Sequence, residues 1–202
     1  MRQLLLVPVS ALILALAVPA QAQHGGGALS SAGPPGDTSE IPRATTREDP
    51  EGAAEDLRLA GKCDEAVPIF RRMSQRAGYA ISWYHLGQCL LTLADASHDP
   101  QHAADLRKEG ASWILRAARS GFAQAEAEAV TVCLDGVGVD RDPVEAEKWA
   151  LVYRHNGLRA VIGLPDVSPD VTSRLDAALT DSTRAEAEAR ANAWEPAAHP
   201  DD

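Results

Sequence analysis

The stretch Asp135–Trp149, DGVGVDRDPVEAEKW, is compatible with three kinds of structure, and each predicts a different kind of protein. Gly136 and Gly138, with aspartates close by, are found together in phosphate-binding turns, in calcium loops and in loops between two helices. The first two structures predict an enzyme or a metal protein. The third predicts a helical scaffold.

The residues around the two glycines favour the loop between helices. A dinucleotide-type phosphate turn follows a strand and has a third glycine, whereas the preceding AQAEAEAVTVCL has a helical composition. A calcium loop needs carboxylates at alternate positions and a distal glutamate, and these aspartates do not have that register. We therefore predict that the glycines adopt backbone angles that other residues avoid, that Val139 packs inward and that Asp142 caps the next helix.

The rest of the chain predicts an all-α fold. Helix starts are marked by an aspartate or serine followed by proline, at Asp49-Pro50, Asp99-Pro100, Asp142-Pro143 and Ser168-Pro169. Apolar residues recur at helical spacing, in a stripe of Ala66, Phe70, Met73 and Ala77 and in another of Trp83, Leu86, Leu90 and Leu93.

The predicted helices also form a repeat. Glu109, Trp113, Leu115 and Gly121 recur 36 residues later as Glu145, Trp149, Leu151 and Gly157. At the front of the unit the offset is 43 residues, as from Gly78 to Gly121 and from Asp99 to Asp142. The difference is about two helical turns, so the helix 100–120 is expected to be two turns longer than its partner 143–156. Such a period indicates stacked helix pairs, and Trp113 and Trp149 are expected to pack between helices.

These residues resemble the Sel-one-like repeat family, a branch of the tetratricopeptide superfamily. The resemblance rests on Trp83–Gly87 (WYHLG), on Asp135–Val139 (DGVGV) and on Glu145-Ala146 with Trp149. Residues 53–77 look like a more ordinary tetratricopeptide pair. The resemblance implies a short right-handed α-solenoid over residues 48–157, and residues 158–202 are expected to form a helical C-terminal cap, with helices at 169–180 and 183–194, and a tail.

The same resemblance implies a binding groove on the first helix of each pair. It places Ile81, Tyr84, Gln88 and Thr92 on one helix, with Gln124, Ala127, Thr131 and Asp135 as their repeat equivalents. A tyrosine and amide side chains suit contacts with a peptide or protein, although an ordinary solvated face has the same composition. The alternating AEAEA stretches at 125–129 and 185–189 predict solvated helix faces.

The amino-terminal sequence predicts export. Arg2 precedes an apolar run that ends in Ala20-Gln21-Ala22, which is typical of a cleaved signal peptide over residues 1–22. Residues 23–47 are rich in Gly, Ser, Pro and Thr and are expected to be a disordered linker. The predicted location is periplasmic or secreted, without membrane insertion after cleavage. The net charge of −10 disfavours nucleic acids and anionic membranes as partners.

Cysteine placement predicts one disulfide. If the chain turns between helices at Ala77-Gly78, Cys63 and Cys89 lie within one turn of each other on antiparallel helices. A Cys63–Cys89 bridge also suits an oxidising compartment. Cys133 aligns with Leu90 at the 43-residue offset and is expected to be a small core residue.

No residue pattern predicts catalysis, a metal site or a cofactor. His98 and His102 flank Asp99, but no third metal ligand is evident, and no nucleophile–base pair has a local signature. The function expected from the sequence is therefore non-enzymatic, that of an interaction or scaffold protein of the bacterial envelope that binds a protein or peptide. The alternative is a periplasmic protein that binds or hydrolyses a small ligand or cell-wall fragment.

Overall fold

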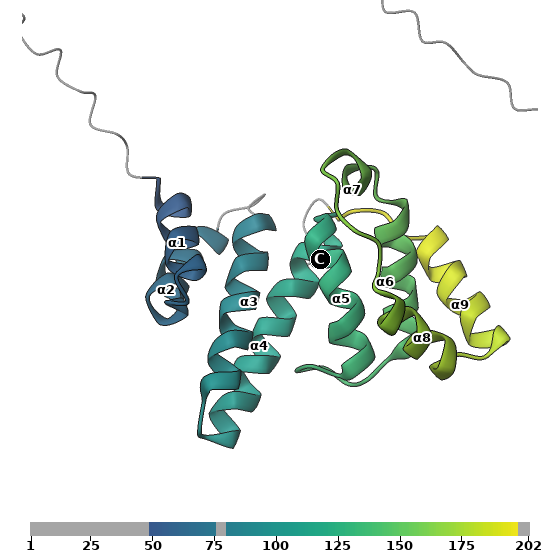
Figure 1. Ribbon diagram of the computed structural model, residues 1–202, viewed down its shortest axis with the longest axis horizontal. Coiled ribbons are helices and arrows are strands. Elements are labelled where there is room, and N and C mark those ends of the chain that lie inside the picture. Colours follow the sequence, from purple (N-terminus) through teal and green to yellow (C-terminus); the bar gives the residue numbers. More distant parts are fainter. Residues whose placement is uncertain (1–48, 76–79, 198–202) are drawn as a thin grey trace, which may run out of the picture. The chain divides into compact units, whose positions relative to one another are not determined.

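The computed structural model describes residues 49–75 and 80–197, and every regular element in these two ranges is a helix (Figure 1). The helices are α1 (Pro50–Leu59), α2 (Cys63–Ser74), α3 (Ala80–Ala96), α4 (Pro100–Arg119), α5 (Ala123–Asp135), α6 (Pro143–His155), α7 (Gly157–Val161), α8 (Pro169–Ala178) and α9 (Asp181–Asn192). The all-α prediction is confirmed for this part of the chain. The predicted signal peptide, the predicted linker and the turn residues Ala77 and Gly78 lie outside the described residues.

The predicted helix starts are confirmed by their capping hydrogen bonds. Asp49, Asp99 and Asp142 accept backbone amides of the first turns of α1, α4 and α6, at 3.1, 2.9 and 3.0 Å for the shortest bond of each. Ser168 accepts the amide of Val171 at 3.3 Å at the start of α8. Each cap is followed by proline, which has no amide to leave unsatisfied at the first helical position.

Consecutive helices from α1 to α6 pack against one another in sequence order, and α9 packs against α6. The predicted difference in helix length is present, since α4 has 20 residues and α6 has 13. The backbones of α3 and α4 lie close together at Gly87 and Gly110. A Cβ atom on Gly87 would lie only 2.8 Å from the Gly110 carbonyl oxygen, so a side chain there would force the helices apart.

The core is built largely from alanine with a few large side chains. The largest cluster surrounds Trp83 and Trp149, which are 2% and 1% exposed, and a second cluster surrounds Phe70 and Leu86 beside the cysteines of α2 and α3. Trp113 is half-buried and packs against both clusters. The expected packing of Trp113 and Trp149 between helices is therefore present.

The loop between α5 and α6 has the predicted form. Gly136 and Gly138 have φ values of +70° and +68°, in the left-handed region that favours glycine. Val139 is partly buried against the cluster of Ala111, Ile114 and Val132. The amide of Asp142 donates to the Cys133 carbonyl at 2.8 Å, which closes the loop before α6 begins.

The C-terminal helices differ in part from the prediction. The expected helix 183–194 begins at Asp181 and ends at Asn192, because Thr180 is extended and forms a capping box with Thr183. The expected helix 169–180 accordingly ends at Ala178. The short helix α7 is not predicted by the sequence. It begins where Asn156 accepts the amide of Leu158 at 3.0 Å.

Candidate functional site

The expected groove residues lie on α3 and α5, and α5 adds a residue that the sequence analysis missed. We call the surface formed by Ile81, Tyr84, Gln88, Thr92, Gln124, Glu128 and Thr131 the α3–α5 face. Gln88 joins the two helices, because its amide nitrogen donates to the Tyr84 hydroxyl at 2.8 Å and to Glu128 Oε2 at 3.0 Å. The ring of Tyr84 also contacts that of Phe122, with 5.4 Å between centroids.

Burial changes the acid–base properties of this array. It raises the pKa of Glu128, against the opposing effects of hydrogen bonds from Gln88 and Tyr84 and of the Arg58 charge. Burial is also the main cause that raises the pKa of Tyr84, followed by the nearby Glu128 carboxylate. The Tyr84 side chain therefore remains a neutral phenol, able to donate its hydroxyl hydrogen, while Glu128 is a partly desolvated acceptor.

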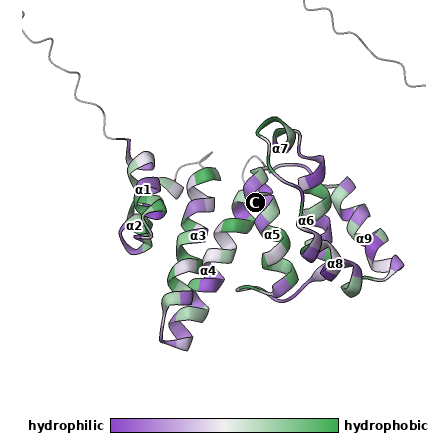
Figure 2. Cartoon of the chain, viewed as in Figure 1, coloured by the Kyte–Doolittle hydropathy of each residue, from purple (hydrophilic) through white to green (hydrophobic). Residues whose placement is uncertain are grey.

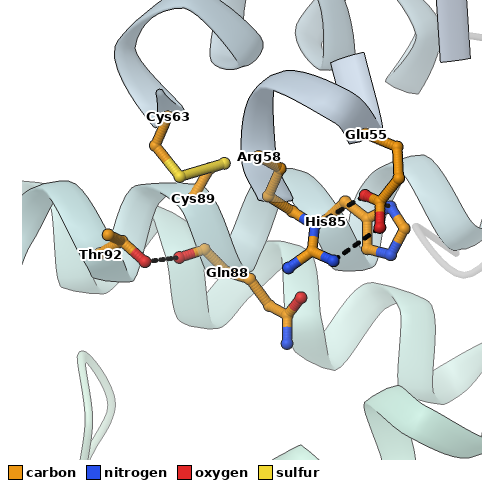
Figure 3. Close-up of a disulfide and its surroundings, with 7 residues drawn as sticks. All are labelled: Glu55, Arg58, Cys63, His85, Gln88, Cys89 and Thr92. Carbon is orange, nitrogen blue, oxygen red and sulfur yellow. Dashed lines mark hydrogen bonds and ion pairs between the residues drawn. A yellow bond between two sulfur atoms is a disulfide. The ribbon is translucent and has the colours of Figure 1, made fainter. Parts of the chain in front are cut away.

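A second polar group from α1 lies next to this array (Figure 3). Arg58 makes a two-pronged hydrogen bond to Glu55, with distances of 2.7 and 2.6 Å. His85 Nδ1 lies 3.0 Å from the same carboxylate. The hydrogen bond from Arg58 lowers the pKa of Glu55, and burial lowers the pKa of His85 despite the nearby carboxylate. Glu55 is thus held ionised, and His85 is favoured in its neutral form.

The other expected groove residues make weaker contributions. The Thr92 hydroxyl donates to the Gln88 carbonyl at 3.0 Å, and the Thr131 hydroxyl donates to the Glu128 carbonyl at 2.9 Å, so both hydrogens are used within their own helices. Ile81 is 40% exposed. In the described part of the chain Gln124 has no side-chain hydrogen bond and is half-buried. Asp135, at the end of α5, is paired with Arg174 of α8.

The expectation of a solvated AEAEA face at 125–129 is wrong. Glu126 is 0% exposed and Glu128 is half-buried, because α5 packs between α4 and α6 and has little surface left for solvent. Glu128 also lies one helical turn beyond Gln124, so helical spacing from that residue could have identified it. In the similar stretch 185–189, Glu186 and Glu188 are exposed as expected.

The cysteines are arranged as predicted. A disulfide joins Cys63 at the start of α2 to Cys89 in α3, with 5.0 Å between the Cα atoms. Cys133 is buried in the largest core cluster, and burial raises the pKa of its thiol to about 12. This thiol is therefore protonated at neutral pH, and the thiolate that a nucleophile requires is not formed.

The described residues show neither a metal-binding cluster nor a membrane-spanning helix. No group of three or more His, Cys, Asp or Glu side chains within 49–75 and 80–197 is placed to hold a metal ion. His98 and His102 both lie on the surface near the start of α4. Within the same two ranges, the helices are too short or too polar to cross a membrane.

No protein-family model matches the chain, and no curated protein matches it. The resemblance to Sel-like repeats therefore depends on the residues named above.

Proposed function

We propose that the chain is a non-enzymatic Sel-like repeat protein, a short right-handed α-solenoid, that binds a peptide or protein segment on its α3–α5 face. The observation that carries this proposal is the bridge that Gln88 makes between Tyr84 and Glu128. It holds an aromatic hydroxyl, an amide and a carboxylate together across two helices, beside the exposed Ile81.

The chemistry of this face suits an extended polypeptide. Glu128 accepts hydrogen bonds and favours N–H groups of a peptide backbone. Both N–H groups of Gln88 are bonded within the array, so this side chain offers its carbonyl oxygen as a second acceptor. Ile81 and the Tyr84 ring supply apolar contact beside these polar groups. The network positions the side chains before a partner arrives, which reduces the entropy lost on binding.

The disulfide supports a location outside the cytoplasm. Such bonds persist in the periplasm and in secreted proteins and are rare where glutathione keeps thiols reduced. Together with the signal-like sequence at residues 1–22, the Cys63–Cys89 bond favours a periplasmic or secreted binding protein. In that compartment the partner would be an envelope protein or a peptide derived from one.

The test is to capture partners from envelope extract with the full chain and to measure the Kd of each purified partner. We expect the double variant Tyr84→Ala/Gln88→Ala to weaken binding by at least about 10-fold, because both the aromatic contact and the bridge are removed. The matched control is His98→Ala/Gln101→Ala, two exposed positions near the start of α4. Equal affinity of both double variants, with unchanged circular dichroism, would exclude the α3–α5 face as the binding surface.

A further inference from the structure

A cavity of about 570 Å³ lies beside α6, α7 and α9, and its lining includes none of the residues of the α3–α5 face. It is bounded by the C-terminal end of α6, the start of α7, the last turn of α9 and the turn between α4 and α5. Its apolar wall is formed by Val152, Leu158, Trp194 and Pro196. This volume is within the range of about 300–1,000 Å³ that small-molecule sites occupy.

The polar groups on this cavity offer a specific set of hydrogen-bonding positions. The Ser120 hydroxyl donates to the Ala117 carbonyl at 2.6 Å, so its oxygen remains as an acceptor. His155 Nδ1 lies 2.8 Å from the Leu151 carbonyl, so in the neutral imidazole Nδ1 carries the hydrogen and Nε2 is an acceptor. The carboxamide of Asn192 has no hydrogen-bond partner among the described residues and offers both donors and an acceptor.

Asn156 also lines the cavity, but its side chain is already engaged. Its amide nitrogen donates to the Gly121 carbonyl at 3.1 Å and to Glu126 Oε2 at 2.8 Å, and its oxygen accepts the amide of Leu158. Glu126 is fully buried behind Asn156. These bonds hold the turn after α4, helix α5 and the start of α7 together, so this side of the cavity is built before any ligand enters.

The lining favours a neutral ligand. Among the described residues, no Lys, Arg, Asp or Glu side chain lines this cavity. Two acceptors at His155 and Ser120 need hydrogen donors from the ligand, and Asn192 accepts or donates. Hydroxyl groups satisfy all three positions, because each is both a donor and an acceptor. The apolar wall with Trp194 requires in addition a ligand with a C–H surface, which a sugar ring has.

We propose that this cavity is a binding site for a neutral, hydroxylated ring compound, of which a hexopyranose is the simplest example. The site shares no residue with the α3–α5 face and does not depend on the function proposed for that face. A second hollow of about 250 Å³ adjoins it, shares His155, Ala191 and Asn192, and is also lined by Glu188. A ligand longer than one ring would extend into this hollow. Helix α7 carries the exposed apolar side chains of Leu158 and Val161. The colours of Figure 2 mark the hydropathy of its residues.

The experiment is a titration of the full chain, followed by backbone amide NMR shifts, with four monosaccharide probes. Glucose and N-acetylglucosamine are neutral, glucosamine is a cation and glucuronate is an anion. We expect the neutral sugars to bind with a Kd of about 1 mM, as a small ligand of this size allows, and both charged sugars to bind more weakly. A β-1,4-linked trisaccharide that binds more tightly than its monomer would identify the end of a glycan as the ligand. Equal affinities of the trisaccharide and its monomer would identify the free monosaccharide as the ligand.

Two variants with matched controls locate the binding. Asn192→Ala removes one neutral hydrogen-bonding group and is expected to weaken binding about 3- to 10-fold, whereas Ser182→Ala, at an exposed position of the same helix, is expected to leave it unchanged. Ala191→Leu fills the cavity and is expected to abolish binding. The control Ala185→Leu, at an exposed position, is expected to leave binding unchanged. The proposal is overturned if no neutral sugar shifts the resonances, if a charged sugar binds best, or if Ala191→Leu binds as tightly as Ala185→Leu.

Discussion

At the scale of single residues, the buried carboxyl of Glu126 is the clearest source of pH-dependent stability. Burial is the main cause that raises its pKa, and the hydrogen bond from Asn156 only partly opposes this. The folded state therefore holds the proton to a higher pH than the unfolded chain does. Stability is lost as the pH rises from the ordinary pKa of a glutamate through the raised one.

We therefore expect Glu126→Gln to stabilise the protein at pH 7, because the amide carries no charge to desolvate and still accepts from Asn156. A gain of the order of 1 kcal/mol would raise the Tm by about 2–4 °C. The gain is expected to shrink at pH 4, where the wild-type carboxyl is largely protonated. The control is Glu195→Gln at an exposed position. If Glu126→Gln destabilised the protein equally at pH 4 and pH 7, the carboxyl of Glu126 would not be the source of the pH-dependent stability.

At the scale of elements, the α5–α6 loop needs glycine at position 138 for two separable reasons. Gly138 has φ +68°, and a Cβ atom there would collide with the Arg107 carbonyl of α4. Gly163 has a similar φ of +72° but nothing within 4 Å of its Cβ position. Gly163→Ala thus measures the cost of the backbone angle alone, about 1–2 kcal/mol. Gly138→Ala is expected to cost about 1–3 kcal/mol more in urea unfolding, because α4 must also move.

The disulfide is a second stabilising feature at this scale, because it joins the start of α2 to α3 across 26 positions of sequence. We expect Cys63→Ala/Cys89→Ala to lower the free energy of unfolding by about 3 kcal/mol. In thiol titration of the denatured wild type, one thiol is expected without reductant, from Cys133, and three after reduction. Three reactive thiols before reduction would show that the bond does not form.

At the scale of the whole molecule, the sequence predicts best what depends on local chemistry. Asp142 and its proline mark the start of α6, and Gly136 and Gly138 mark the loop before it, because caps and left-handed turns involve neighbouring residues. The Cys63–Cys89 pair could be predicted because antiparallel neighbouring helices limit which positions face each other.

Contacts between distant helices were harder to predict. The repeat offset pairs Gln88 with Thr131, yet its side chain reaches Glu128, since the exact rotation of α5 depends on its packing between α4 and α6. The ion pairs that Glu147 makes with Arg154 and Arg184, at 4.0 and 3.7 Å, likewise depend on how the C-terminal helices fold back. Neither the cavity beside α7 nor the burial of Glu126 has a signal in the local sequence.

The packing of α9 on α6 predicts that the C-terminal helix is needed to complete the core. Trp194 contacts the buried Trp149 edge-to-face with 6.0 Å between ring centroids, and Ala187 of α9 is 0% exposed. A chain that ends at Thr180 would expose Trp149 and is expected to lose about 3 kcal/mol of stability in urea unfolding and to bind a hydrophobic dye. A chain that ends at Ala197 keeps all described contacts and serves as the control. If both chains unfold at the same urea concentration, the prediction is wrong. The apolar face of α6 would then be as stable when exposed to water as it is when covered by α9.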